Sequence, residues 1–278
     1  MDAEAQFAHA LRAIESYLPD LVIVGGWAHR LFRFHPWAGH DPFRLLTTDD
    51  ADLLAPLRMK ARGQSIHALL EAGKFRVRLS GETPPVTKYF PEDSSGFHVE
   101  FIAARVGSGT TRAGDQDTAR VISGVTVQLL RYADLLEINP WKMKLDPISG
   151  ARLASGGLAV RVANPVAYLA QKVLVAPRSD RSRLKQAKDV LYVHDTLMLM
   201  SGSLDDLGLE WGRVCQGLHS SLVKRLHQTR RSEFAGVTDR IREASLIAKA
   251  SGRADPPEPA LIRQVCQTGL ERVFGGGR

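Results

Sequence analysis

Apolar residues recur along the chain with two different periods, and the change of period divides it into two parts. In the first part, short runs alternate apolar and polar positions or are wholly apolar, as in half-buried and fully buried strands. We expect strands at residues 21–24, 43–54, 75–79, 86–90, 97–102, 125–130 and 158–162. Helical spacing occurs there at residues 3–17, 27–32 and 61–72.

From residue 164 onward, apolar positions are spaced three and four residues apart, which is typical of amphipathic helices. We expect helices at residues 166–176, 183–200, 204–234, 237–250 and 260–274. The pattern therefore predicts an α+β protein, with a sheet-containing domain at residues 1–163 and a helical domain at residues 164–278.

An acidic segment at residues 47–54 places three carboxylates within four positions. Asp50 and Asp52 are two residues apart, so on a strand both side chains point to one face and Asp49 points to the other. Two carboxylates on one rigid face suit a hard divalent cation such as Mg²⁺. An Asp-rich turn or a helix N-cap has the same composition, so this segment alone leaves both interpretations open.

Two further features surround the acidic segment. Gly25 and Gly26 stand between a predicted strand and a predicted helix, an arrangement that exposes backbone N–H groups able to bind phosphate; a simple tight turn is the alternative. Glu100 lies in an apolar strand, where an unpaired buried charge is costly. A metal ion shared with Asp50 and Asp52 would supply its partner.

The composition narrows the class of partner. The 278 residues carry a net charge of +7, which favours an anionic partner such as a nucleotide or nucleic acid, although many soluble proteins are equally basic. The two cysteines, Cys215 and Cys266, have no disulfide-type or zinc-type spacing. The chain has neither a signal peptide pattern nor an apolar run of about 20 residues, so we expect a cytoplasmic protein and no membrane partner.

The helical part contributes a lysine, an aspartate and a group of basic residues. Lys172 lies within the first predicted helix and Asp189 within the second. Such residues are ordinarily a helix lysine reaching for solvent and a surface ion pair. The basic residues between and around them are Arg178, Arg181, Arg183, Lys185 and Lys188.

Taken in order, these motifs resemble the nucleotidyltransferases of the polymerase-beta superfamily. The motifs are Gly25-Gly26, the T-x-D-x-D segment with Thr48, Asp50 and Asp52, then Glu100, Lys172 and Asp189. Residues 169–190 are similar to two related groups, the AbiE-type toxin nucleotidyltransferases and a bacterial family with a second helical lobe. The resemblance covers residues 20–200, with two departures: many members have Gly-Ser at Gly25-Gly26, and the third carboxylate is Glu100 in place of aspartate.

The resemblance implies a nucleotidyltransferase fold, in which a mixed β-sheet is flanked by helices and followed by a helical lobe. It implies transfer of a nucleoside monophosphate from a nucleoside triphosphate (NTP), such as ATP, to a hydroxyl, with Mg²⁺ or Mn²⁺ as cofactor. The catalytic and metal-binding residues would be Asp50, Asp52 and Glu100, the last alternatively a general base. The nucleotide-binding residues would be Gly25, Gly26, Thr48, Lys172 and Asp189. The RNA-binding residues would be Arg178, Arg181, Arg183 and Lys185.

Three functions compete on this basis. The first is transfer to RNA, above all tRNA, as in the toxins that the chain resembles, with an antitoxin protein as a partner. The second is transfer to a small molecule, as in antibiotic-modifying relatives, or to a protein. The third is a nucleotide- or RNA-binding module without catalysis. The basic second half favours the first function, and the presence of all three carboxylates argues against the third.

Overall fold

The computed structural model describes residues 3–39, 43–46, 48–81, 85–92, 96–107, 117–145, 157–178 and 181–276. The chain divides into two compact units. The sheet unit consists of Met1–Ala28 and Thr48–Ala163, and the helical unit of His29–Thr47 and Asn164–Arg278. The passage from sheet to helices therefore falls at residue 163, where the sequence pattern changes, and residues 29–47 group with the helices.

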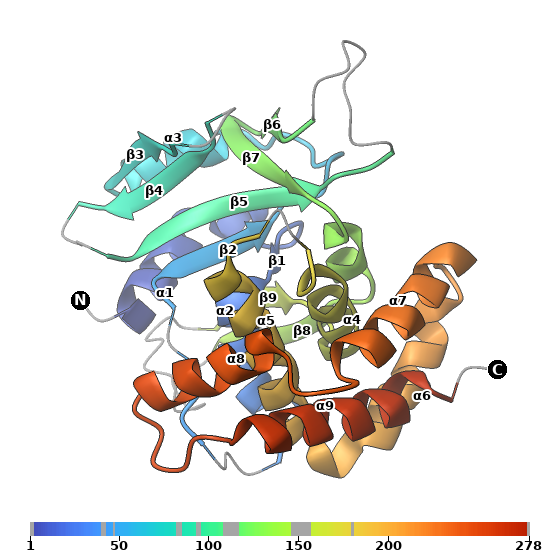
Figure 1. The fold of residues 1–278 in the computed structure, drawn as a ribbon. Helices are drawn as coiled ribbons and strands as arrows, with labels where there is room; N and C mark the ends of the chain where they lie inside the picture. Colours follow the sequence, from blue (N-terminus) through green and yellow to red (C-terminus); the bar gives the residue numbers. More distant parts are fainter. Residues whose placement is uncertain are drawn as a thin grey trace. The chain divides into compact units, whose positions relative to one another are not determined.

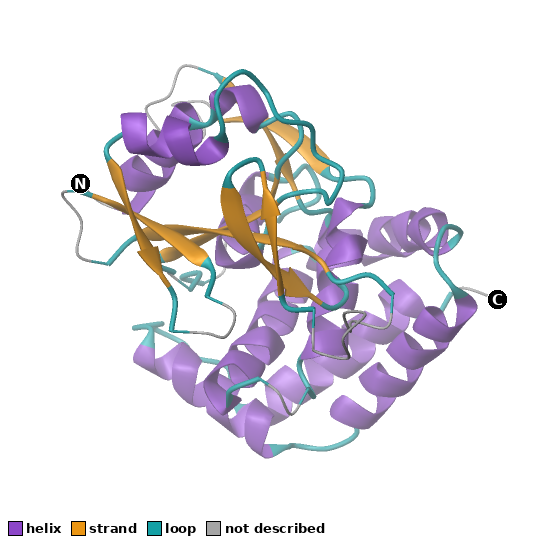
Figure 2. Ribbon diagram, turned by 90° about the horizontal axis from the view of Figure 1, so that it is seen from above, coloured by secondary structure: helices purple, strands orange, loops and turns teal. Residues whose placement is uncertain are grey.

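The described part of the sheet unit contains one mixed sheet (Figure 1; Figure 2). Its strands are β1 (Val22–Ile23), β2 (Asp50–Leu54), β3 (Phe75–Leu79), β4 (Thr87–Pro91), β5 (His98–Ala104), β6 (Ala119–Ile122), β7 (Val125–Leu130), β8 (Trp141–Leu145) and β9 (Leu158–Val162). They follow the order β3-β4-β5-β2-β1-β9-β8, and β7 pairs with β5 and β6. The pairs β1–β9, β2–β5 and β5–β7 are parallel and the others antiparallel, which confirms the expected mixed sheet.

An aromatic cluster joins two helices of the sheet unit, α1 (Ala3–Ala13) and the start of α2 (Gly25–Leu31), to the residue that precedes β5. The unit also contains α3 (Ile66–Ala72). The ring of Phe7 on α1 stacks on Trp27 with centroids 3.9 Å apart, and Trp27 meets Phe97 edge-on at 6.3 Å. All three side chains are buried, so the apolar stripe that the sequence predicted for the first helix does face the core.

Several predicted boundaries are wrong for identifiable reasons. Strands β6 and β8 lie in segments where no strand was predicted; β8 alternates apolar residues with lysines and pairs with β9, a long-range contact that local composition does not show. The predicted strand at residues 43–54 is a strand only from Asp50, and the predicted helix at residues 61–72 begins at Ile66 because the Ser65 hydroxyl caps it, accepting from the Ala68 N–H at 3.1 Å.

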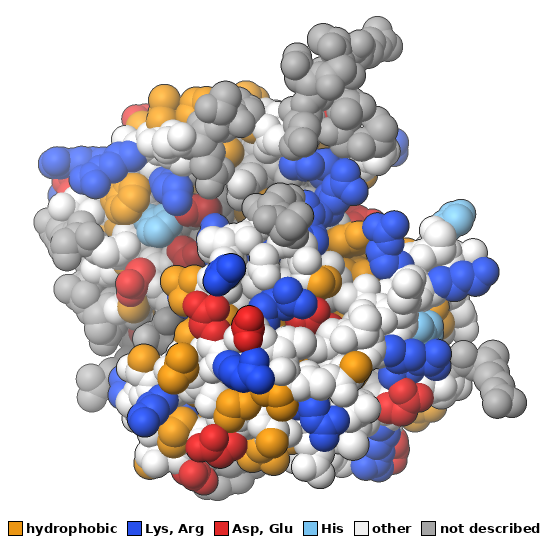
Figure 3. Space-filling model, in the orientation of Figure 1, with side chains coloured by type: hydrophobic (Ala, Val, Ile, Leu, Met, Phe, Trp, Pro, Cys, Tyr) orange, Lys and Arg blue, Asp and Glu red, His pale blue; other side chains and the backbone are white. Residues whose placement is uncertain are grey.

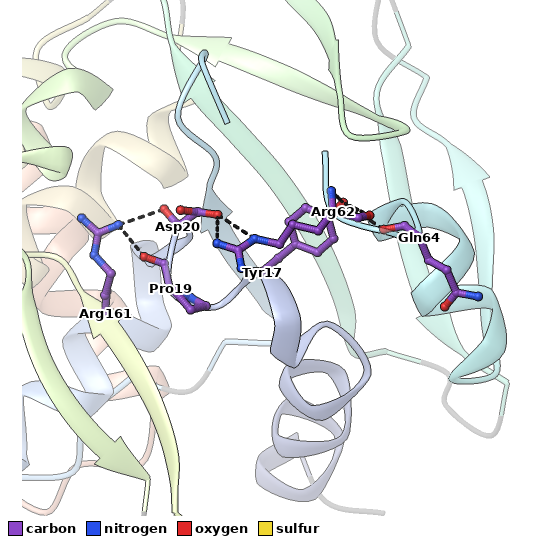
Figure 4. Close-up of polar contacts among 6 residues, drawn as sticks. All are labelled: Tyr17, Pro19, Asp20, Arg62, Gln64 and Arg161. Atoms are coloured by element: carbon purple, nitrogen blue, oxygen red, sulfur yellow. Dashed lines mark hydrogen bonds and ion pairs between the residues drawn. The ribbon is translucent and has the colours of Figure 1, made fainter. Parts of the chain in front are cut away.

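A polar network connects the segment that precedes β1 with the segment that follows β2 (Figure 4). The buried Tyr17 hydroxyl lies 2.9 Å from the carbonyl oxygen of Gln64 and accepts from the Arg62 N–H at 2.9 Å. The Arg62 guanidinium pairs with Asp20 at 2.7 Å, and Arg161 on β9 donates to the Asp20 carbonyl at 3.0 Å. The network ties the approach to β1 to the segment that follows β2, and these two strands carry the site described below.

The helical unit contains α4 (Pro165–Val175), α5 (Arg183–Leu199), α6 (Leu204–Cys215), α7 (Ser220–Glu233), α8 (Asp239–Ala250) and α9 (Pro259–Phe274). The helix predicted at residues 204–234 is thus two helices. An ion pair, Asp195 with Arg253, is buried in this unit, with one nitrogen–oxygen distance of 2.9 Å. Burial raises the pKa of the Asp195 carboxyl, but the bonds from Arg253 and His194 outweigh this effect and lower it. Among the described residues, no helix is long and apolar enough to cross a membrane.

Candidate active site

A close approach between Gly25 and Asp52 forms the centre of the candidate site. The backbone of Gly25 has φ +61°, and a Cβ atom at this position would lie 2.1 Å from Oδ2 of Asp52. The strand pairing that causes the approach continues up to the glycine, because the Val24 N–H donates to the Asp52 carbonyl at 3.1 Å. Both the conformation and the contact require glycine, so the first glycine of the pair is more than a permissive turn residue.

The alternation along β2 places its acidic residues as the sequence predicts. Asp50 and Asp52 are half-buried on one face of the strand, and Ala51 and Leu53 are buried on the other. The Thr48 hydroxyl donates a hydrogen bond to the Asp50 carboxylate, which fixes the orientation of that side chain. Asp49, outside the strand, is exposed. The two carboxylates therefore share one surface next to Gly25.

Glu100 lies beside this pair but takes different partners from those expected. In the parallel pairing of β2 with β5, Glu100 is opposite Asp52 and His98 is opposite Asp50. The Glu100 carboxylate forms an ion pair with Lys88 on β4 and accepts from Nε2 of His98 at 2.7 Å. Burial raises the pKa of Glu100, but the hydrogen bonds from His98 and Lys88 outweigh it and lower the pKa to about 2.

Glu100 was expected to share a metal ion with Asp50 and Asp52. Its charge does not require that ion, because Lys88 and His98 compensate it. Sequence reasoning missed Lys88, although it lies at a same-face position of an alternating strand, because the pairing of β4 with β5 is a long-range contact. A carboxyl with so low a pKa is also a weak proton acceptor, which weighs against Glu100 as a general base.

The donor set near Gly25 fits a hard cation only in part. Asp50 and Asp52 supply carboxylate oxygens on one face, the ligands that Mg²⁺ and Mn²⁺ take in proteins. Within the part of the chain that the structure describes, no group of three or more His, Cys, Asp or Glu side chains is arranged to hold a metal ion. The residues present therefore fit a metal held by two carboxylates, its remaining positions filled by water and substrate oxygens.

The helical unit contains a buried cluster of one carboxylate and two cations. Nζ of Lys172 on α4 lies 2.8 Å from one oxygen of Asp189 on α5, and the Arg181 guanidinium donates to the other oxygen at 2.7 Å. The Lys172 ammonium is also 5.3 Å from the ring centroids of both Tyr168 and Tyr192. Lys172 and Asp189 are thus neither a solvent-seeking lysine nor a surface ion pair, since both are buried.

This cluster changes the interpretation of the basic segment. Arg181 was expected to contact RNA, but its guanidinium is bonded to the buried Asp189. Arg183 and Lys185 are exposed in the first turn of α5, and the Arg178 carbonyl accepts from the Gln186 side chain at 2.8 Å. Of the predicted RNA-binding residues, Arg183 and Lys185 therefore present their side chains at the surface.

His29, at the end of α2, is a buried group that no motif indicated. It is 0% exposed, and neither ring nitrogen has a hydrogen-bond partner among the described residues. Its ring lies 4.9 Å from that of Tyr192. Burial is the main cause that lowers the pKa of His29 to about 4, so the imidazole is neutral at neutral pH.

The mixed sheet, with a glycine turn against a two-carboxylate strand, is the arrangement of a nucleotidyltransferase fold. A family model described as nucleotidyltransferase matches residues 3–212, and the chain belongs to this family. No curated protein matches the chain. The protein is therefore a nucleotidyltransferase, an enzyme that takes a nucleoside triphosphate and transfers its nucleoside monophosphate.

Proposed function

We propose that this nucleotidyltransferase transfers a nucleoside monophosphate to a hydroxyl of RNA, tRNA above all, with Mg²⁺ or Mn²⁺ bound by Asp50 and Asp52. The observation that carries the proposal is the close approach of Gly25 to Asp52. It leaves the backbone of Gly25 and Gly26 next to the carboxylate pair, where a triphosphate would contact both.

The reaction needs little covalent participation from the protein. The acceptor oxygen attacks the α-phosphorus in line, a new phosphorus–oxygen bond forms, and the bond to the pyrophosphate oxygen breaks. The hydroxyl proton passes to solvent. A bound divalent cation would supply charge neutralisation for the phosphate oxygens. Thr48 holds Asp50 in orientation, and Glu100 lies beside the pair with its charge compensated by Lys88 and His98.

The Lys172 cluster supports a role in binding the triphosphate. Asp189 accepts from both Lys172 and Arg181, so it holds two cationic side chains in fixed positions with a net charge of about +1 among the three groups. A cation that is already oriented loses little side-chain entropy when it binds phosphate. We therefore assign Lys172 to the β- and γ-phosphates and Asp189 to positioning it, with Arg181 as a further member of the cluster.

The net charge of +7 and the exposed Arg183 and Lys185 support an RNA acceptor, because the RNA backbone is a polyanion. Arg178 is assigned to RNA binding as well, because it belongs to the same basic segment of the sequence. A toxin activity in the cytoplasm, restrained by an antitoxin protein, follows only from the resemblance in the sequence and is proposed together with the RNA acceptor.

The test is incorporation of label from each of the four NTPs into total RNA by the full-length protein with Mg²⁺. We expect labelled RNA with the wild-type protein and none with Asp52→Asn. Asp49→Asn is the matched control, because Asp49 is an exposed neighbour outside the strand, and it should keep the wild-type rate. Absence of labelled RNA would reject the RNA acceptor, and an unchanged rate in Asp52→Asn would reject the assigned site.

A further inference from the structure

A row of stacked side chains extends from the acidic pair across the sheet toward its β3 edge. The Phe90 ring on β4 stacks against His98 on β5, with centroids 5.0 Å apart and planes inclined by 24°. On the other strand neighbouring β4, the guanidinium of Arg78 on β3 lies 4.7 Å from the centroid of Phe90. We call Arg78, Phe90 and His98 the stacking row.

The register places the stacking row on the same face as the catalytic carboxylates. Arg78 is opposite Lys88 and Arg76 is opposite Phe90, so these β3 and β4 residues share a face. Across β5, His98 is opposite Asp50. Figure 3 shows Lys and Arg side chains gathered with histidine and acidic side chains over this part of the sheet. The face therefore passes from cationic and planar groups at β3 to carboxylates at β2.

The length of this face suits a polymer better than a small acceptor. Three strand spacings of about 4.8 Å separate β3 from β2, which gives roughly 14 Å from Arg78 to Asp52. An acceptor that contacts both the carboxylates and Arg78 has to span this distance, and a few nucleotides of a single strand do so. Arg76 adds a positive charge at the same edge, with its side chain 70% exposed and its Nε 3.4 Å from a carboxylate oxygen of Glu92.

On the basis of the proposed function, we propose that the stacking row binds the single-stranded end of the acceptor RNA. A base stacks on the guanidinium plane of Arg78, which Phe90 holds from behind, and Arg76 contacts the phosphate backbone. Stacking on aromatic rings and guanidinium planes is the usual way in which proteins hold unpaired bases. These residues are positioning residues that direct the terminal hydroxyl toward Asp50 and Asp52.

The test measures RNA binding separately from transfer. Fluorescence anisotropy uses the full-length protein, EDTA, no NTP, and a labelled single-stranded RNA of about ten nucleotides. Arg78→Lys keeps the charge but removes the planar face, and Phe90→Leu keeps apolar volume but removes the ring. Arg131→Ala, which removes an exposed arginine in the turn after β7, is the control for charge alone.

We expect Arg78→Lys and Phe90→Leu each to weaken RNA binding about ten-fold, since stacking contributes roughly 1–3 kcal/mol per base, while Arg131→Ala changes it little. Equal affinity of the wild-type protein and Arg78→Lys overturns the proposal, because a surface that only attracts negative charge, as for an acidic peptide, would not distinguish them. Thermal denaturation of each variant shows whether its fold is intact.

Transfer assays distinguish this proposal from the proposed function. A raised KM for RNA in Phe90→Leu, with the KM for NTP unchanged, supports the stacking row. Labelling of RNA with an unchanged KM for RNA refutes the stacking row and leaves the RNA acceptor standing. RNA binding that depends on Arg78 and Phe90, in a protein that labels no RNA, refutes RNA as the acceptor of the transfer and supports the binding surface.

Discussion

Substituting Gly25 by alanine adds a single methyl group at the most crowded point of the candidate site. The new Cβ would lie 2.1 Å from Oδ2 of Asp52. An ordinary carbon–oxygen contact is about 3.4 Å, so the carboxylate, or the turn, has to withdraw by roughly 1.3 Å. The positive φ of residue 25 adds about 1–2 kcal/mol of backbone strain once a side chain is present.

The two effects separate in experiment. A displacement of about 1 Å in a group that positions the substrate can cost roughly 100-fold in rate, so we expect kcat for nucleotide transfer to fall by about that factor in Gly25→Ala. Urea denaturation should show a loss of about 1–2 kcal/mol, which leaves the protein folded.

Gly63→Ala is the matched control for Gly25→Ala. Nothing lies within 4 Å of a Cβ at Gly63, so its activity and stability should stay close to those of the wild-type protein. Wild-type kcat in Gly25→Ala would refute the argument that the absence of a side chain at this position keeps Asp52 in place.

Three further variants test the framework around the site. Tyr17→Phe removes the hydroxyl that holds the segment after β2, and urea denaturation should show a loss of about 1–2 kcal/mol. Asp189→Asn leaves two cations without their carboxylate and should lower the free energy of unfolding by roughly 3 kcal/mol. In the same assay, the control Asp239→Asn, at an exposed ion pair, should lower it by less than about 0.5 kcal/mol. The fold lowers the pKa of His29 from 6.5 to about 4, so the folded protein keeps this imidazole neutral where the unfolded chain protonates it. The contribution of His29 to folding stability is therefore complete above pH 6.5 and decreases as the pH falls toward 4. Between about pH 8 and pH 5, the wild-type protein should therefore lose roughly 2 kcal/mol relative to His29→Leu, and parallel pH profiles of the two proteins would contradict this assignment.

The stripe of apolar residues in the first helix was predictable because it depends on local spacing. The same holds for β3, β7 and β9, which begin and end at the predicted residues. The shared face of Asp50 and Asp52 was predictable for the same reason. Residues two positions apart point to the same side of any strand, so these two carboxylates lie together once the segment is extended. Apolar spacing alone does not locate the start of α3. It predicted a helix from residue 61, but the hydrogen bond that the Ser65 side chain accepts caps the helix so that it begins at Ile66.

The partners of the charged residues could not be predicted from local spacing. The sequence indicates that Glu100 needs a compensating charge, but Lys88 is 12 positions away and His98 is two, and only the pairing of β4 with β5 brings all three groups together. Arg181 likewise looked like part of a surface basic run, but its guanidinium lies 2.7 Å from an oxygen of Asp189, which is buried on α5.

By itself, the sequence predicted most of the helices and strands and the shared face of Asp50 and Asp52, because these depend on period and residue type. The tertiary structure alone decided that Gly25 lies against Asp52, that Lys88 and His98 neutralise Glu100, and that Arg78 and Phe90 line the face that leads to the carboxylates. The physical reason is that strand order and helix packing join residues far apart in the chain, and the free energy of those contacts depends on geometry that no local pattern contains.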